Sequence, residues 1–135
     1  MKEVILLFNF EQTKARKLTT QLLMMKFKVK VVKEEEWGYP VGYLCGSLET
    51  IEENEKTPEE QKLDSAMLVM AGVDGNRLNQ VLNAIKKSGI GKVPYKAVVT
   101  ETNQHWLPQN LLQELKLEHE EMQSNEGNKN MLHEK

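Results

Sequence analysis

The chain has 135 residues, of which 39% are hydrophobic and 28% charged, and this is enough apolar material for one compact core. Its 18 basic and 20 acidic residues give a formal net charge of -2, which argues against a disordered chain and against nucleic acid as a partner. The longest apolar run, Val4 to Phe8, is far shorter than the roughly 18 residues that cross a bilayer. The start of the chain lacks a signal-peptide pattern, and the single cysteine, Cys45, cannot form an internal disulfide. We therefore expect a soluble, cytoplasmic protein that does not bind a membrane.

Charge alternates along the chain. Residues 1–33 carry a net charge of +6 and residues 34–65 a net charge of -8. A solvated surface of mixed charge explains most of this alternation. The more specific alternative is a basic face that binds a ligand.

The first half of the chain begins with a strand over residues 4–8. Asn9 and Gln12 resemble a capping box for a helix over residues 11–25. Strict alternation predicts a half-exposed strand over residues 27–31, and residues 42–45 are expected to form a short strand after a turn.

The second half repeats this order. Residues 66–71 form a continuous apolar strand, and Asp74 is the expected N-cap of a helix over residues 75–88 that ends at Gly89. A strand over residues 95–101 and a last helix over residues 108–122, with Pro108 in its first turn, complete the pattern.

The element order β-α-β-β-α-β predicts an α+β, two-layer, ferredoxin-like domain with an additional C-terminal helix. A small doubly wound α/β sheet is the alternative. The first and third strands are apolar on both faces and should therefore lie in the middle of the sheet. Two helices cover one face, so the C-terminal helix, the acidic linker or a second copy of the chain must cover the other. We expect the C-terminal helix there, with a homodimer as an open alternative.

The expected domain organisation is a single domain over residues 1–122. Residues 48–65 are polar and rich in Glu, which is typical of an acidic linker between the two halves. Residues 123–135 have little apolar content, so we expect a disordered tail.

The residues that could carry catalysis or bind a metal form no readable motif. Cys45 could be a nucleophile with His105 or His119 as base, but a single Cys in an apolar run is more typical of a core. The three histidines are 14 residues apart, which is far from a metal-ligand spacing. We predict no metal site and no cofactor.

Polar side chains gather where the last strand ends and the last helix begins, which is a common place for a small binding site. Residues that could bind a ligand or partner there are Lys96, Thr100, Thr102, Asn103 and Trp106. The alternative is that Thr102 and Asn103 make local turn hydrogen bonds and Trp106 packs the last helix onto the sheet.

The apolar run 66–70, the helix with Leu78, Leu82 and Ile85, and the string Lys-Ala-Val-x-Thr-x-x-Asn-x-x-Trp at residues 96–106 are followed by Glu118 and His119. Over residues 66–121 this pattern resembles the bacterial family known as domain of unknown function 3783. The resemblance implies a small bacterial cytoplasmic α/β protein and assigns no activity. Two departures from that pattern are Glu101-Thr102 in place of a Thr-Pro turn and Leu107 in place of a helix-capping Ser or Thr.

The sequence favours a non-enzymatic binding or regulatory module that recognises a small metabolite or a protein partner. An enzyme that uses Cys45 with a histidine is the alternative.

Overall fold

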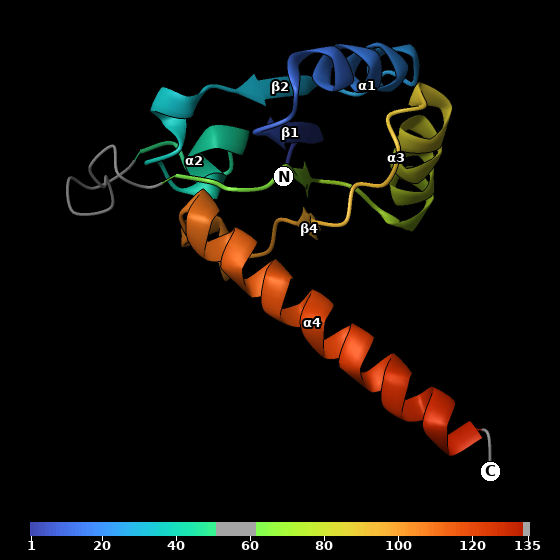
Figure 1. The fold of residues 1–135 in the computed structure, drawn as a ribbon. Coiled ribbons are helices and arrows are strands. Elements are labelled where there is room, and N and C mark those ends of the chain that lie inside the picture. The colour runs from blue at the N-terminus through green and yellow to red at the C-terminus, as the bar shows by residue number, and fades with distance from the viewer. Residues whose placement is uncertain (51–61, 134–135) are drawn as a thin grey trace.

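The structure of the chain, a computed structural model, describes residues 1–50 and 62–133, with side chains as far as residue 122 (Figure 1). The elements in chain order are β1 (Val4–Phe8), α1 (Gln12–Met24), β2 (Val29–Val32), η1 (Glu34–Glu36), α2 (Val41–Cys45), β3 (Met67–Ala71), α3 (Gly75–Ser88), β4 (Lys96–Val98), η3 (Asn103–His105) and α4 (Pro108–His133). Most of the predicted linker and the predicted disordered tail lie outside the residues whose side chains are described, so those two predictions are untested.

The four strands form one mixed sheet in the order β2-β1-β3-β4. Each helix-linked pair, β1 with β2 and β3 with β4, is adjacent and parallel, and β1 pairs with β3 antiparallel. The sheet therefore consists of two β-α-β units that meet at the central strands. The predicted α+β class and the central positions of the first and third strands are confirmed.

The ferredoxin-like topology is not confirmed. That topology separates the two strands that each helix connects, whereas here they are neighbours. The physical reason lies in residues 33–66, which contain η1 and α2 and are too long for a hairpin. Because no tight turn holds β2 against β3, β2 pairs beside β1 through the crossover helix α1.

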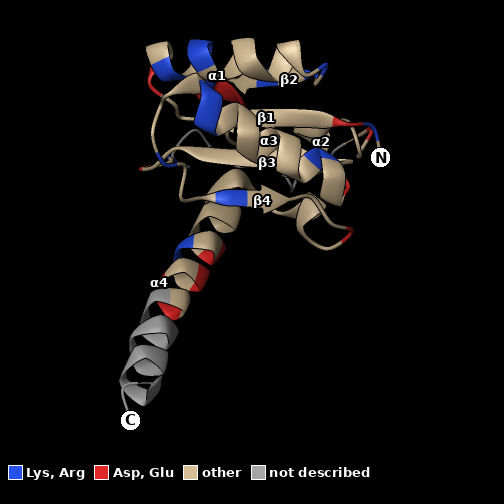
Figure 2. Cartoon of the chain, turned by 90° about the vertical axis from the view of Figure 1, so that its right-hand side faces the viewer, with Lys and Arg blue, Asp and Glu red and all other residues tan. Residues whose placement is uncertain are grey.

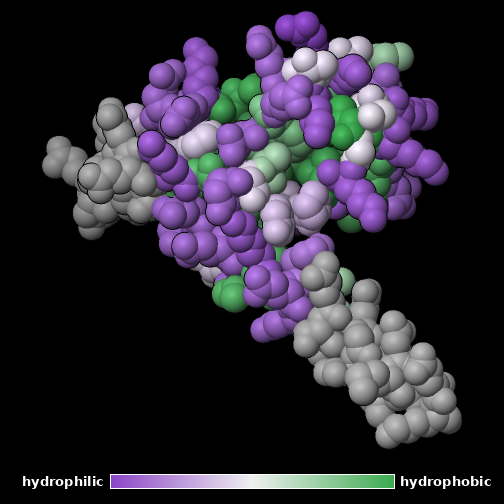
Figure 3. Space-filling view, in the orientation of Figure 1, coloured by the Kyte–Doolittle hydropathy of each residue, from purple (hydrophilic) through white to green (hydrophobic). Residues whose placement is uncertain are grey.

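Helices cover both faces of the sheet. Alternate residues of β1 point to opposite sides, so Ile5 and Leu7 pack against α1 and α3, and Leu6 and Phe8 pack against α2 and the start of α4. Leu111 and Leu112 of α4 lie in this second cluster and are 2% exposed, which confirms that the C-terminal helix covers the second face. In Figure 3 hydrophilic residues make up most of the visible surface.

The predicted strand over residues 42–45 is wrong, because these residues form the short helix α2. Pro40 precedes its first turn, and Gly46 takes the left-handed conformation (φ 86°) that ends it. The helix packs closely against η3: a Cβ on Gly42 would lie 2.7 Å from the carbonyl oxygen of Gln104. Apolar side chains in this segment fill a core, and their spacing alone did not distinguish a strand from a short helix.

The predicted capping box at Asn9 is also wrong. Asn9 has a positive φ of 58°, and its side-chain amide donates to the carbonyl of Leu63, 3.0 Å away. Glu11 occupies the N-cap of α1 and makes no side-chain cap hydrogen bond. This hydrogen bond therefore holds the segment around Leu63 next to the end of β1. In contrast, Asp74 caps α3 as predicted, accepting from the Arg77 N–H at 2.8 Å.

Arg77 joins α3 to the start of the chain and to the turn after α1. Its guanidinium donates to both carboxylate oxygens of Glu3, at 2.8 and 2.6 Å, and to the Met25 carbonyl at 3.0 Å. It also lies 3.7 Å from the centre of the Phe27 ring. The hydrogen bonds from Arg77 lower the pKa of the Glu3 carboxyl.

Charge differs between the layers. The charged residues of α1 are basic, and most of those in the described part of α4 are acidic (Figure 2). Among the described residues, no helix is both long enough and apolar enough to cross a membrane.

Candidate functional site

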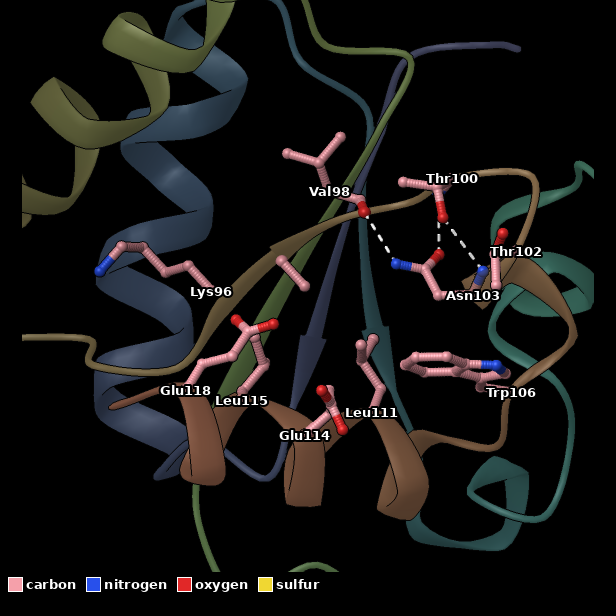
Figure 4. Close-up of a pocket in the computed structure, with 11 residues that line it drawn as sticks. Lys96, Val98, Thr100, Thr102, Asn103, Trp106, Leu111, Glu114, Leu115 and Glu118 are labelled. Carbon is pink, nitrogen blue, oxygen red and sulfur yellow. Dashed lines mark hydrogen bonds between the residues drawn. The ribbon is translucent and has the colours of Figure 1, made fainter. Parts of the chain in front are cut away.

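The turn after β4 is held by the side chain of Asn103 (Figure 4). Its Nδ2 donates to the Val98 carbonyl at 3.0 Å, and its Oδ1 accepts from the Thr100 N–H at 2.7 Å. The Asn103 N–H in turn donates to Thr100 Oγ1 at 3.0 Å. The local hydrogen bonds expected of Asn103 as a turn residue are thus present, and both polar atoms of its amide are occupied.

A pocket of about 310 Å³ lies between β4, this turn and α4. All five residues predicted to bind a ligand or partner line this pocket. The complete lining is Lys96, Ala97, Val98, Thr100, Thr102, Asn103, Trp106, Leu111, Glu114, Leu115 and Glu118.

The α4 wall of the pocket combines an apolar stripe with two carboxylates. Leu111 and Leu115 face the core, and Glu114 and Glu118 rise beside them toward β4 (Figure 4). The two glutamates are one helical turn apart, and neither has an ion-pair or hydrogen-bond partner within the described part of the chain. Sequence reasoning missed both. The available signal was their i, i+4 spacing next to Leu111 and Leu115, which puts them on the flank of the buried stripe.

Lys96 lines the pocket with its aliphatic stem while its ammonium group turns away. The ammonium donates to the carbonyl of Val93 on the connection that precedes β4. Burial lowers the pKa of this group. Of the charged groups that line the pocket, the two carboxylates therefore point into it and the ammonium does not.

The indole of Trp106 closes the pocket at the end near the turn. Trp106 is partly buried against the core cluster, and its carbonyl accepts from the N–H of Val41 at 2.9 Å. This bond fixes the start of α2 beside the pocket. Thr102 makes no side-chain cap hydrogen bond to η3 and is exposed at the rim.

Cys45 lies outside this pocket. Its thiol is buried and donates to the Gly42 carbonyl at 3.5 Å and to Ser47 Oγ at 3.6 Å. Ser47 Oγ continues to Gln104 Oε1 at 2.9 Å. Within the described residues, no histidine is hydrogen-bonded to this thiol. The hydrogen-bond network instead joins α2 to η3.

The other two candidate catalytic residues in the described chain, His105 and His119, are likewise not part of the pocket lining. His105 is exposed on η3, and the His119 ring packs edge-on against Tyr95 with centroids 5.7 Å apart. Among the residues that the structure describes, no group of three or more His, Cys, Asp or Glu side chains could hold a metal ion.

Comparison with known proteins gives one match. Neither the curated proteins nor the solved structures contain a match to the chain. Residues 66–122 match a family model, and this range includes every residue that lines the pocket. The family is the one that the sequence pattern resembles, so that prediction is confirmed. Residues 66–122, which build β3, α3, β4 and the described part of α4, thus match the model of the family described as Domain of unknown function (DUF3783).

Proposed function

We propose that the chain is a non-enzymatic binding module whose pocket between β4 and α4 takes a group with an apolar body and a positively charged end. The observation that carries this proposal is the pair of carboxylates, Glu114 and Glu118, that stands over an apolar wall without a cationic partner in the described chain. The proposal includes a reducing cytoplasm as its setting, because Cys45 is the single cysteine.

The shape and chemistry of the lining support this ligand class. Ala97, Leu111 and Leu115 offer apolar contact, and the glutamates offer charge at the open side. Both glutamates are exposed, so a neutral apolar ligand would gain nothing from their charge, and an anion would be repelled by it. A small amine and the side chain of a protein partner present the same chemistry, so both fit.

The enzyme alternative gains no support from the geometry. Nucleophilic catalysis by a thiol needs a base within hydrogen-bond reach, and the partners of Cys45 Sγ are a carbonyl and a hydroxyl. We expect Cys45 in the folded protein to stay unmodified by iodoacetamide near pH 6, where a low-pKa thiolate would react rapidly.

A thermal-shift measurement with defined probes tests the proposal. Butylamine and phenethylamine should raise the midpoint of unfolding, and butyrate should not. A probe at 100 times its Kd stabilises the fold by about 2.7 kcal/mol, which corresponds to several degrees for a domain of this size.

Variants on α4 identify the site. Glu114→Gln and Glu118→Gln remove the charges at the pocket and should abolish the shift, whereas Glu120→Gln, on the same helix outside the lining, should keep it. A shift that survives the loss of both pocket charges, or the absence of any shift with amines, would refute the proposal.

A further inference from the structure

The outer edge of β4 carries main-chain groups that point away from the sheet. On the inner side, the Tyr95 carbonyl accepts from Leu68 at 3.0 Å and the Val99 N–H donates to Met70 at 2.8 Å. Because these groups alternate along a parallel strand, the N–H and carbonyl groups of Lys96 and Val98 point to the free edge.

Asn103 already occupies part of this edge. In a parallel ladder, one residue of the added strand donates its N–H to one carbonyl and accepts from the N–H two residues further on. The side-chain amide of Asn103 does the same: it donates to the Val98 carbonyl and accepts from the Thr100 N–H. Its amide thus stands in for the one residue of a fifth strand that would lie opposite Val99.

The next position along the edge is open. The Lys96 N–H, the Lys96 carbonyl and the Val98 N–H have no hydrogen-bond partner among the residues that the structure describes. These three groups flank Ala97, which lines the pocket. An unpaired edge of this kind is a template for an added strand.

A residue placed opposite Ala97 would direct its side chain into the pocket. Register partners in adjacent parallel strands point their side chains to the same face, and Ala97 faces the cluster that includes Leu111. A long side chain there would pass over Leu111 and Leu115 and reach the carboxylates of Glu114 and Glu118. Lysine and arginine combine the required aliphatic stem and positive end.

We infer that the pocket takes the Lys or Arg side chain of an extended peptide segment from a protein partner, which adds to the β4 edge as a short parallel strand. This inference rests on the proposed function and specifies its ligand. The main chain of the peptide occupies the three open groups of Lys96 and Val98, and Asn103 limits the strand on one side. Backbone pairing gives affinity, and the paired carboxylates select the basic side chain.

A peptide series measured by calorimetry tests the inference. The probe is acetyl-Val-Thr-Val-Lys-Thr-amide, compared with the same peptide carrying Glu in place of Lys and with a version methylated on the Lys backbone nitrogen. We expect the parent peptide to bind, the Glu peptide not to bind and N-methylation to weaken binding at least tenfold. Methylation removes the donor to the Lys96 carbonyl and leaves the Lys side chain unchanged.

Two proline variants give a matched control on the protein. Val98→Pro removes the outward N–H from the β4 edge and should weaken peptide binding at least fivefold. Val31→Pro makes the same change at the free edge of β2 and should leave binding within twofold of the parent. Circular dichroism checks that both variants fold. If Val98→Pro does not fold, the N-methylated peptide still tests whether binding depends on hydrogen bonds at the β4 edge.

The outcomes separate this inference from the proposed function. If butylamine binds and N-methylation has no effect, the pocket binds amines, but the strand addition is refuted. If neither butylamine nor the peptide binds, both are refuted. The protein could also sediment as a dimer and protect the Val98 amide from exchange before any peptide is added. That result would place a second copy of the chain at this edge and refute the inferred peptide binding.

Discussion

Replacing Asn103 with Ala should destabilise the fold and open the β4 edge. The change removes two hydrogen bonds, one to the Val98 carbonyl and one from the Thr100 N–H. A typical hydrogen bond contributes about 0.5–1.5 kcal/mol net. Because the turn is exposed and water can replace part of the loss, we expect a decrease of about 1–2 kcal/mol in the free energy of unfolding, to be measured by urea denaturation.

Thr102→Ala is the matched control for this change. Thr102 lies next to Asn103 and lines the same pocket, but it makes no side-chain cap hydrogen bond. Its loss should change the free energy of unfolding by about 0.5 kcal/mol or less. Equal effects of the two substitutions would contradict the role assigned to the Asn103 amide.

Amide exchange gives a second and more local measurement. The Thr100 N–H is bonded to Asn103 Oδ1, so it should exchange slowly in the native protein and rapidly in Asn103→Ala. The exposed Val98 carbonyl and Thr100 N–H should also increase self-association through the sheet edge, which sedimentation detects. Unchanged exchange at Thr100 would refute the reasoning, whatever the change in stability.

Three further changes test the rest of the fold. Gly42→Ala places a Cβ 2.7 Å from backbone and should cost about 1–3 kcal/mol in urea denaturation, whereas Gly75→Ala, with no atom within 4 Å, should not destabilise. Leu18→Ala, at a fully buried position, should cost about 3 kcal/mol in the same assay. Arg77 lowers the pKa of the Glu3 carboxyl. Glu3→Gln should therefore lower the thermal midpoint of unfolding at pH values above 4.5, the ordinary pKa of this group. That difference in thermal midpoint should vanish as pH falls through the lowered pKa; a difference independent of pH would contradict the ion pair.

The elements were predicted correctly where the local sequence pattern and the tertiary packing favour the same structure. The α3 helix has both a side-chain cap at Asp74 and a left-handed Gly89, and its predicted bounds match the structure. The apolar runs of β1 and β3 were equally clear, because both faces of a central strand are buried. The prediction for the segment around Gly42 was wrong because five residues, four of them buried, are too few for periodicity to separate a strand from a helical turn.

Topology and part of the site depend on contacts that a local pattern does not contain. The same element order fits β2 beside β1 or beside β3, and the choice depends on the long connection between β2 and β3. The polar turn around Asn103 was visible in the sequence, since its residue types are typical of turns. Glu114 and Glu118 were not recognised, because only the docking of α4 brings them opposite β4.

The connection between β2 and β3 also sets the order in which the sheet assembles. Each β-α-β unit forms its parallel ladder within a continuous stretch of chain, whereas the β1–β3 ladder must close across residues 33–66. Pairing between distant segments is slow because the entropy of the loop is lost before the contacts form. Doubling the length of this connection should therefore cost only about 0.6 kcal/mol of closure entropy and slow folding without a matching change in the unfolding rate.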